Sequence, residues 1–110
     1  MKAKCVVVLV TCPNRAVARR IASVVVTKRL AACVNLLPGI ESVFRWEGKI
    51  DRSREVLLLI KTTRRRFSSL AHALARLHPY DVPEVIALPV TAGVASYLRW
   101  VARSVSADRP

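Results

Sequence analysis

A pair of long extended segments dominates the pattern of apolar and polar positions. Residues 31–63 predict two strands that meet in a tight turn at 46–49, where Gly48 can adopt the positive φ that such a turn requires. Each strand would be about 13 residues long, so at about 3.3 Å per residue the arm would reach about 40 Å. A compact chain of this size has a radius of gyration of only about 13 Å. We therefore expect the arm to extend beyond its own domain and to lie against another copy of the chain.

Shorter apolar runs predict the remaining elements. Residues 5–10 are a continuous, mostly β-branched run, as expected for a buried strand. Asn14 is a favourable N-cap for a helix, and Pro79 ends a later helix because it moves His78 out of the helical region. The predicted elements are a strand at 5–10, a helix from Asn14 to 28 or 29, a strand from 32 with a bulge or bend at Pro38-Gly39, a strand at 50–63, a helix at 67–77, a strand at 84–90 and a short helix at 95–103.

This order, βαββαβ with a C-terminal helix, predicts an α+β fold of the ferredoxin-like type in a single domain spanning 1–110. The strands near 5–10, 56–60 and 85–90 are apolar at both odd and even positions, that is, on both faces. A strand with one face in water instead alternates apolar and polar residues. Leaving about six Val and Leu side chains in water would forgo roughly 1.5–3 kcal/mol each. The second sheet face is therefore expected to be covered by the last helix or by other copies of the chain.

Composition narrows the class of protein. Hydrophobic residues make up 53% of the 110 residues, so an intrinsically disordered chain is excluded. The longest apolar runs are about five residues, which is too short for a transmembrane helix, and the N-terminal run lacks the features of a signal peptide. We therefore expect a cytoplasmic protein without a membrane partner. The three cysteines have no C-x-x-C spacing, so neither a disulfide framework nor a thiolate zinc site is predicted.

The net charge of +12 permits binding to nucleic acid or to an acidic surface. A ferredoxin-like module that binds RNA places aromatic residues on its two central strands, where they stack on bases. The corresponding segments here, CVVVLV (5–10) and VLLLI (56–60), have none. A nucleic-acid-binding module remains the alternative function, and it is disfavoured because this face is aliphatic.

His78 is the best candidate metal ligand, together with Tyr80, Asp81 and Glu84, which follow it closely in the sequence. Imidazole suits copper and zinc, and carboxylates can complete a coordination shell. The alternative is that His78 only ends a helix, where a partial positive charge favours the last carbonyl groups.

Cys12 is the second candidate metal ligand. It lies just before a predicted helix N-terminus and close to Arg15, a setting that lowers the pKa of a thiol and favours the thiolate. The alternative is that Cys12 is a small packing residue.

Three consecutive arginines, Arg64, Arg65 and Arg66, precede the second helix, where positive charge is unfavourable unless an anion binds at the helix N-terminus. They indicate either an anion site or a solvated run of charge. No catalytic motif is present, and the chain has only three glycines and no glycine-rich phosphate loop. We do not expect an enzyme.

Six ordered blocks of this sequence resemble the CutA divalent-cation-tolerance family. They are VTCPN (10–14), KRLAACVNLLPGI (28–40), WEGKI (46–50), LIKT (59–62), HPYDVPEVIALPV (78–90) and YLRW (97–100).

The resemblance implies a ferredoxin-like subunit in a tight homotrimer, with the architecture of the PII signalling proteins and with long hairpins that pair between subunits. It implies binding of Cu(II) or another divalent cation, or of a small anionic ligand, in metal homeostasis or signalling, with no cofactor needed for folding. Val10 and Leu77 occupy the positions of the family's metal-binding cysteine and first histidine, so only His78 matches. Residues that would line an inter-subunit pocket or interface are Lys61, Trp46, Glu47, Tyr80 and Glu84.

Overall fold

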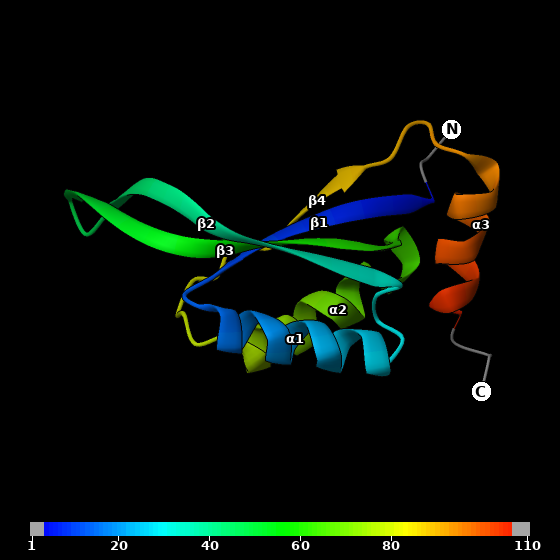
Figure 1. Ribbon diagram of the computed structural model, residues 1–110, viewed down its shortest axis with the longest axis horizontal. Coiled ribbons are helices and arrows are strands. Elements are labelled where there is room, and N and C mark those ends of the chain that lie inside the picture. Colours follow the sequence, from blue (N-terminus) through cyan, green and yellow to red (C-terminus); the bar gives the residue numbers. More distant parts are fainter. Residues whose placement is uncertain (1–3, 107–110) are drawn as a thin grey trace.

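The computed structural model describes residues 4–106, and it confirms the predicted order of elements (Figure 1). The elements are β1 (Cys5–Cys12), α1 (Arg15–Thr27), β2 (Cys33–Trp46), β3 (Lys49–Thr63), α2 (Arg64–Leu77), β4 (Ile86–Pro89) and α3 (Ala95–Ser104). The strands form an antiparallel sheet in the order β2-β3-β1-β4. Helices α1 and α2 cover one face, and α3 lies at the end of the sheet away from the hairpin turn (Figure 1). This is the predicted ferredoxin-like α+β fold.

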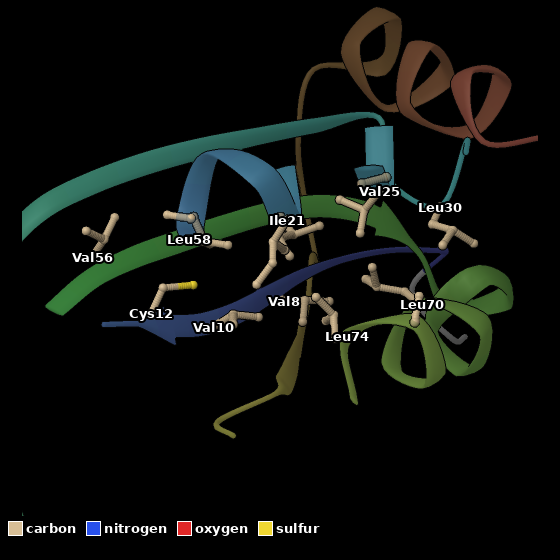
Figure 2. Close-up of a cluster of buried hydrophobic side chains, with 14 of the residues drawn as sticks. Val8, Val10, Cys12, Ile21, Val25, Leu30, Val56, Leu58, Leu70 and Leu74 are labelled. Atoms are coloured by element: carbon tan, nitrogen blue, oxygen red, sulfur yellow. The ribbon is translucent and has the colours of Figure 1, made fainter. Parts of the chain in front are cut away.

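The core lies between the sheet and the helix pair α1–α2 (Figure 2). Alternate residues of the two central strands point toward the helices, because side chains on a strand alternate between faces. The buried residues that form this layer include Val6, Val8 and Val10 of β1, Val56, Leu58 and Ile60 of β3, Ala18, Ile21 and Val25 of α1, and Leu70, Ala73 and Leu74 of α2. Each large aliphatic side chain buried here stabilises the fold by roughly 1.5–3 kcal/mol.

Most element boundaries differ from the sequence-based prediction by one or two residues, as at β1, which ends at Cys12 rather than at residue 10. Those of α2 and β4 differ most. Helix α2 begins at Arg64 rather than at 67, because the Thr63 hydroxyl accepts a hydrogen bond from the Arg66 N–H at 3.3 Å and acts as the N-cap. Strand β4 covers four residues rather than 84–90, because it pairs only with residues 6–9 of β1. It is an edge strand and ends at Pro89, which has no N–H to donate to a sheet ladder.

The β2–β3 hairpin forms the predicted arm, with strands of 14 and 15 residues, and the molecule is 44 Å long. Glu47 and Gly48 both have positive φ (49° and 79°), as in a two-residue type I′ turn. The sequence indicated this conformation only for Gly48. The predicted bulge is confirmed by the register shift between Leu37 and Ile40 and by Gly39, whose φ is 79°.

The sheet face opposite α1 and α2, here called the open face, is apolar and has no helix layer. The strand registers place on it Val7 and Leu9 of β1, Leu57 and Leu59 of β3, Leu37 of β2, and Ile86 and Leu88 of β4. Helix α3 contacts β1 and β3 only at one end, where the Cys5 thiol lies 3.8 Å from the carbonyl oxygen of Leu98. Ile86 and Leu88 therefore remain 49% and 47% exposed.

Candidate functional site

The loop between α2 and β4 is fixed to the sheet through His78. The residue before a proline is excluded from the helical region, so His78 ends α2 in an extended conformation, with ψ at 137°. Its ring is buried: Nδ1 accepts a hydrogen bond from the Tyr80 N–H at 3.1 Å, and Nε2 donates to the carbonyl oxygen of Thr11 at 2.7 Å. Both ring nitrogens therefore have hydrogen-bond partners within the chain.

Tyr80 in turn reaches the arm. Its hydroxyl donates a 2.7 Å hydrogen bond to Glu55 Oε2, and Glu55 is only 7% exposed. Burial, followed by the hydrogen bond to Glu55 and its negative charge, raises the pKa of the Tyr80 phenol. The phenol therefore stays a neutral donor at physiological pH. This pair was not predictable from the sequence, because Glu55 follows a run of mostly exposed polar residues and its partner Tyr80 lies in a distant loop.

A hollow of about 750 Å³ lies between this loop and the outer part of the arm. Its lining contains four of the chain's seven acidic residues, although the net charge of the chain is +12. The acidic side chains are Asp51, Glu55, Asp81 and Glu84, and the aromatic ones are Phe44, Trp46 and Tyr80. Arg52 is the basic residue of the lining. This acidic hollow combines carboxylates and aromatic rings, both of which attract cations.

Cys12 does not have the predicted properties. The prediction was a thiol with a lowered pKa, but Cys12 is fully buried and its pKa is raised to about 11, first by burial and then by the charge of Glu55. The prediction failed because the side chain points into the core between the sheet and α1 rather than toward solvent at the helix N-terminus (Figure 2). Cys12 is therefore a neutral packing residue at physiological pH.

The predicted metal cluster is not assembled within residues 4–106. No three His, Cys, Asp or Glu side chains in this part of the chain lie close enough together to hold a metal ion. Asp81 and Glu84 line the acidic hollow, whereas His78 is absent from its lining and is held by Thr11 and Tyr80. Direct coordination of copper by His78 and Cys12 does not fit their surroundings, because the His78 ring nitrogens are hydrogen-bonded and Cys12 is buried. Metal binding by this pair stays a prediction.

The residues that the resemblance assigned to an inter-subunit pocket or interface do not all lie together. Trp46, like Tyr80 and Glu84, lines the acidic hollow. Glu47 forms the turn and Lys61 donates a hydrogen bond to Asn35 Oδ1, and neither of them lines the hollow. The register places Lys61 on the open face.

The three arginines at the start of α2 have different surroundings. Arg66 joins the two helices, because its Nε and Nη2 donate to the carbonyl oxygen of Arg29, just beyond α1, at 3.3 and 3.2 Å. Arg64 and Arg65 are exposed, and the Arg64 N–H donates to the carbonyl oxygen of Lys4. Anion binding by these residues stays a prediction.

Comparison with known proteins decides the family. The sequence model described as "CutA1 divalent ion tolerance protein" matches residues 6–104. The chain belongs to this family. The divalent-cation tolerance protein CutA of Thermus thermophilus is 50% identical over 95 residues, which cover 86% of this chain and 92% of that protein. Protein CutA of Homo sapiens is 54% identical over 92 residues, which cover 84% of this chain. These 92 residues are 51% of the human protein, so the chain spans about half of that relative.

Solved structures of the family have the same fold. The CutA1 structure of Oryza sativa superposes with a TM-score of 0.92 at 44% identity, covering 97% of this chain and 98% of that one. The T. thermophilus structure gives 0.91 at 46% identity, covering 93% of this chain and 99% of that one. The family description and the name of the T. thermophilus relative refer to tolerance of divalent ions. None of the helices within residues 4–106 has the length and apolar content needed to cross a bilayer.

Proposed function

We propose that the protein is a homotrimeric, PII-like binding protein of the CutA1 family, which captures a divalent cation in the acidic hollow and serves metal-ion homeostasis in the cytoplasm without catalysis. The family description and the name of the T. thermophilus relative both refer to divalent ions. The apolar open face supports assembly, because covering Ile86, Leu88 and their neighbours removes this surface from water.

The observation that carries the cation proposal is the concentration of acidic residues at one place. Carboxylate oxygens suit hard divalent cations, which often retain part of their water shell. The hollow is large enough for such a hydrated ion, and Asp81 and Glu84 are exposed on its lining. Tyr80 fixes the carboxylate of Glu55 through the 2.7 Å hydrogen bond. Because no three acidic side chains of the described residues lie close enough to coordinate one ion together, the carboxylates would hold the cation largely through its retained water shell.

Isothermal titration with Mn²⁺ tests this proposal. The variant Asp81→Asn/Glu84→Gln removes two carboxylates from the hollow and is expected to weaken binding at least tenfold. Its matched control, Glu41→Gln/Glu47→Gln, makes the same change of net charge at two exposed arm residues outside the lining and is expected to bind as the wild type does. Equal affinity in the two variants would refute the hollow as the site.

Copper binding by His78 and Cys12 stays a prediction from the sequence, because His78 alone matches a family metal position and both side chains are buried. Titration of His78→Ala and Cys12→Ala with Cu(II) addresses it. We expect both variants to keep the wild-type affinity, because the hollow and not this pair supplies the ligands. A loss of affinity in either variant would instead favour the copper site.

A further inference from the structure

The positive charge of the chain is segregated from its negative charge. Within residues 4–106, every Asp and Glu lies in the hairpin or in the loop at 81–84. Helices α1 and α2 contain seven arginines and no acidic residue. The exposed cations of this helix pair, here called the basic helix face, are Arg15, Arg19, Arg20, Lys28, Arg64, Arg65 and Arg76.

Helix geometry gathers these cations on the surface that faces away from the sheet. The apolar side of each helix packs into the core, so the charged positions point outward. The two helices run side by side on the same face of the sheet (Figure 1), and Arg20 Nη2 donates to the carbonyl oxygen of Leu77 at 3.4 Å. This contact brings the start of α1, with Arg15 and Arg19, next to the end of α2, with Arg76.

From this arrangement we propose that the basic helix face binds the phosphate backbone of double-stranded nucleic acid without sequence preference. Arginine presents a planar fork of donors that matches phosphate oxygens. Hydroxyl groups also bind phosphate, and the exposed Ser23, Ser68 and Ser69 lie among the arginines on the same helices. The absence of acidic residues from both helices leaves no carboxylate there to repel a polyanion.

The composition of the face favours a duplex over two other polyanions. A single strand is held by stacking on aromatic rings, but Phe67 of α2 packs against the core, which leaves the small imidazole of His72 as the exposed ring of these helices. A helix that lies on an anionic bilayer buries an apolar face in it, whereas the apolar faces of α1 and α2 are occupied. The face also lies opposite the open face, so it stays accessible when copies of the chain cover the latter.

This surface differs from the sheet face on which RNA-recognition modules bind, and it does not involve the acidic hollow. The inference is therefore independent of the proposed cation function. If the hollow binds no cation, the nucleic-acid proposal is unaffected. If the basic helix face binds no duplex, the cation proposal is unaffected.

Fluorescence anisotropy with a labelled 20-base-pair DNA duplex tests the proposal between 50 and 200 mM salt, with an RNA duplex of the same length as a second probe. If about five phosphates are neutralised, the slope of log K against log salt is expected to be about −4.5 for DNA. We expect comparable binding of both duplexes and weaker binding of a single strand and of anionic phosphatidylserine vesicles.

The decisive comparison uses two triple variants with the same net charge. Arg15→Gln/Arg19→Gln/Arg76→Gln removes cations from the basic helix face and spares Arg20 and Arg66, which link the helices. It is expected to make the salt slope shallower by up to about 3. The control Arg45→Gln/Arg54→Gln/Arg103→Gln changes exposed arginines elsewhere and is expected to keep the wild-type slope.

Three results would overturn the proposal: no wild-type binding to either duplex at 50 mM salt, equal weakening by both triple variants, or tighter binding to the single strand or to the vesicles. Thermal unfolding of each variant shows whether it is folded. Should the helix-face triple unfold, the single variants Arg15→Gln and Arg76→Gln replace it, each with an expected change of slope of about 1.

Discussion

Replacing Tyr80 by Phe tests the contact between the loop and the arm. The change removes only the hydroxyl that donates to Glu55, a residue that is 7% exposed. A hydrogen bond to a charged group contributes about 1.5–3 kcal/mol, and the buried carboxylate loses this donor. Because the bond is short and buried, we expect Tyr80→Phe to lower the free energy of unfolding by about 2 kcal/mol, which is roughly 30-fold in the folding equilibrium.

Urea unfolding at pH 7 measures this loss, with all proteins compared at one concentration because assembly adds to apparent stability. In a Glu55→Gln background the acceptor is neutral, so Tyr80→Phe is expected to cost only about 1 kcal/mol. The contribution of this hydrogen bond to stability also depends on pH. The folded state raises the pKa of the phenol, so the contribution is complete below the ordinary pKa near 10 and declines as the pH rises above it. A loss under 0.5 kcal/mol at pH 7 would refute the role assigned to the pair.

Three further changes probe other parts of the fold. The buried Cys12 thiol, with its pKa raised to about 11, is expected to resist iodoacetamide in the native protein at pH 8 and to react after unfolding; alkylation at the rate of a free thiol in the native state would contradict this. Gly39→Ala is expected to lose about 1 kcal/mol in urea unfolding, from backbone strain alone, because φ is 79° and no atom lies within 4 Å of the added Cβ; an unchanged midpoint would argue against the bulge. Leu74→Ala leaves a cavity in the core and is expected to lose about 2–5 kcal/mol, whereas Ala75→Ser on the exposed side of α2 serves as the near-neutral control.

Much of the fold was predictable because local signals and packing agree. The apolar runs of β1 and β3, the N-cap at Asn14 and the proline after His78 each act over a few residues, and the order of the elements then implies the topology. The length of the arm and the bulge before Ile40 were predicted for the same reason.

The chemistry of the site was less predictable, because it depends on contacts between distant segments. Glu55 and Tyr80 are 25 residues apart, and only the path of the loop brings them together. The lowered pKa predicted for the Cys12 thiol was wrong, because closeness to Arg15 along the sequence does not show whether the side chain is buried. The acidic hollow likewise joins residues 42–55 to residues 80–84, and no local pattern links these segments.

If other copies of the chain cover the apolar open face, the protein has a larger mass in solution than one chain, and static light scattering after size-exclusion chromatography measures this mass. For the wild type at micromolar concentration, we predict a mass about three times that of one chain. Leu88→Glu places a charge on the open face and is expected to shift the mass toward the single chain, while Arg103→Glu on exposed α3 keeps the larger mass. A wild-type mass equal to that of one chain would show that no other copy covers the open face.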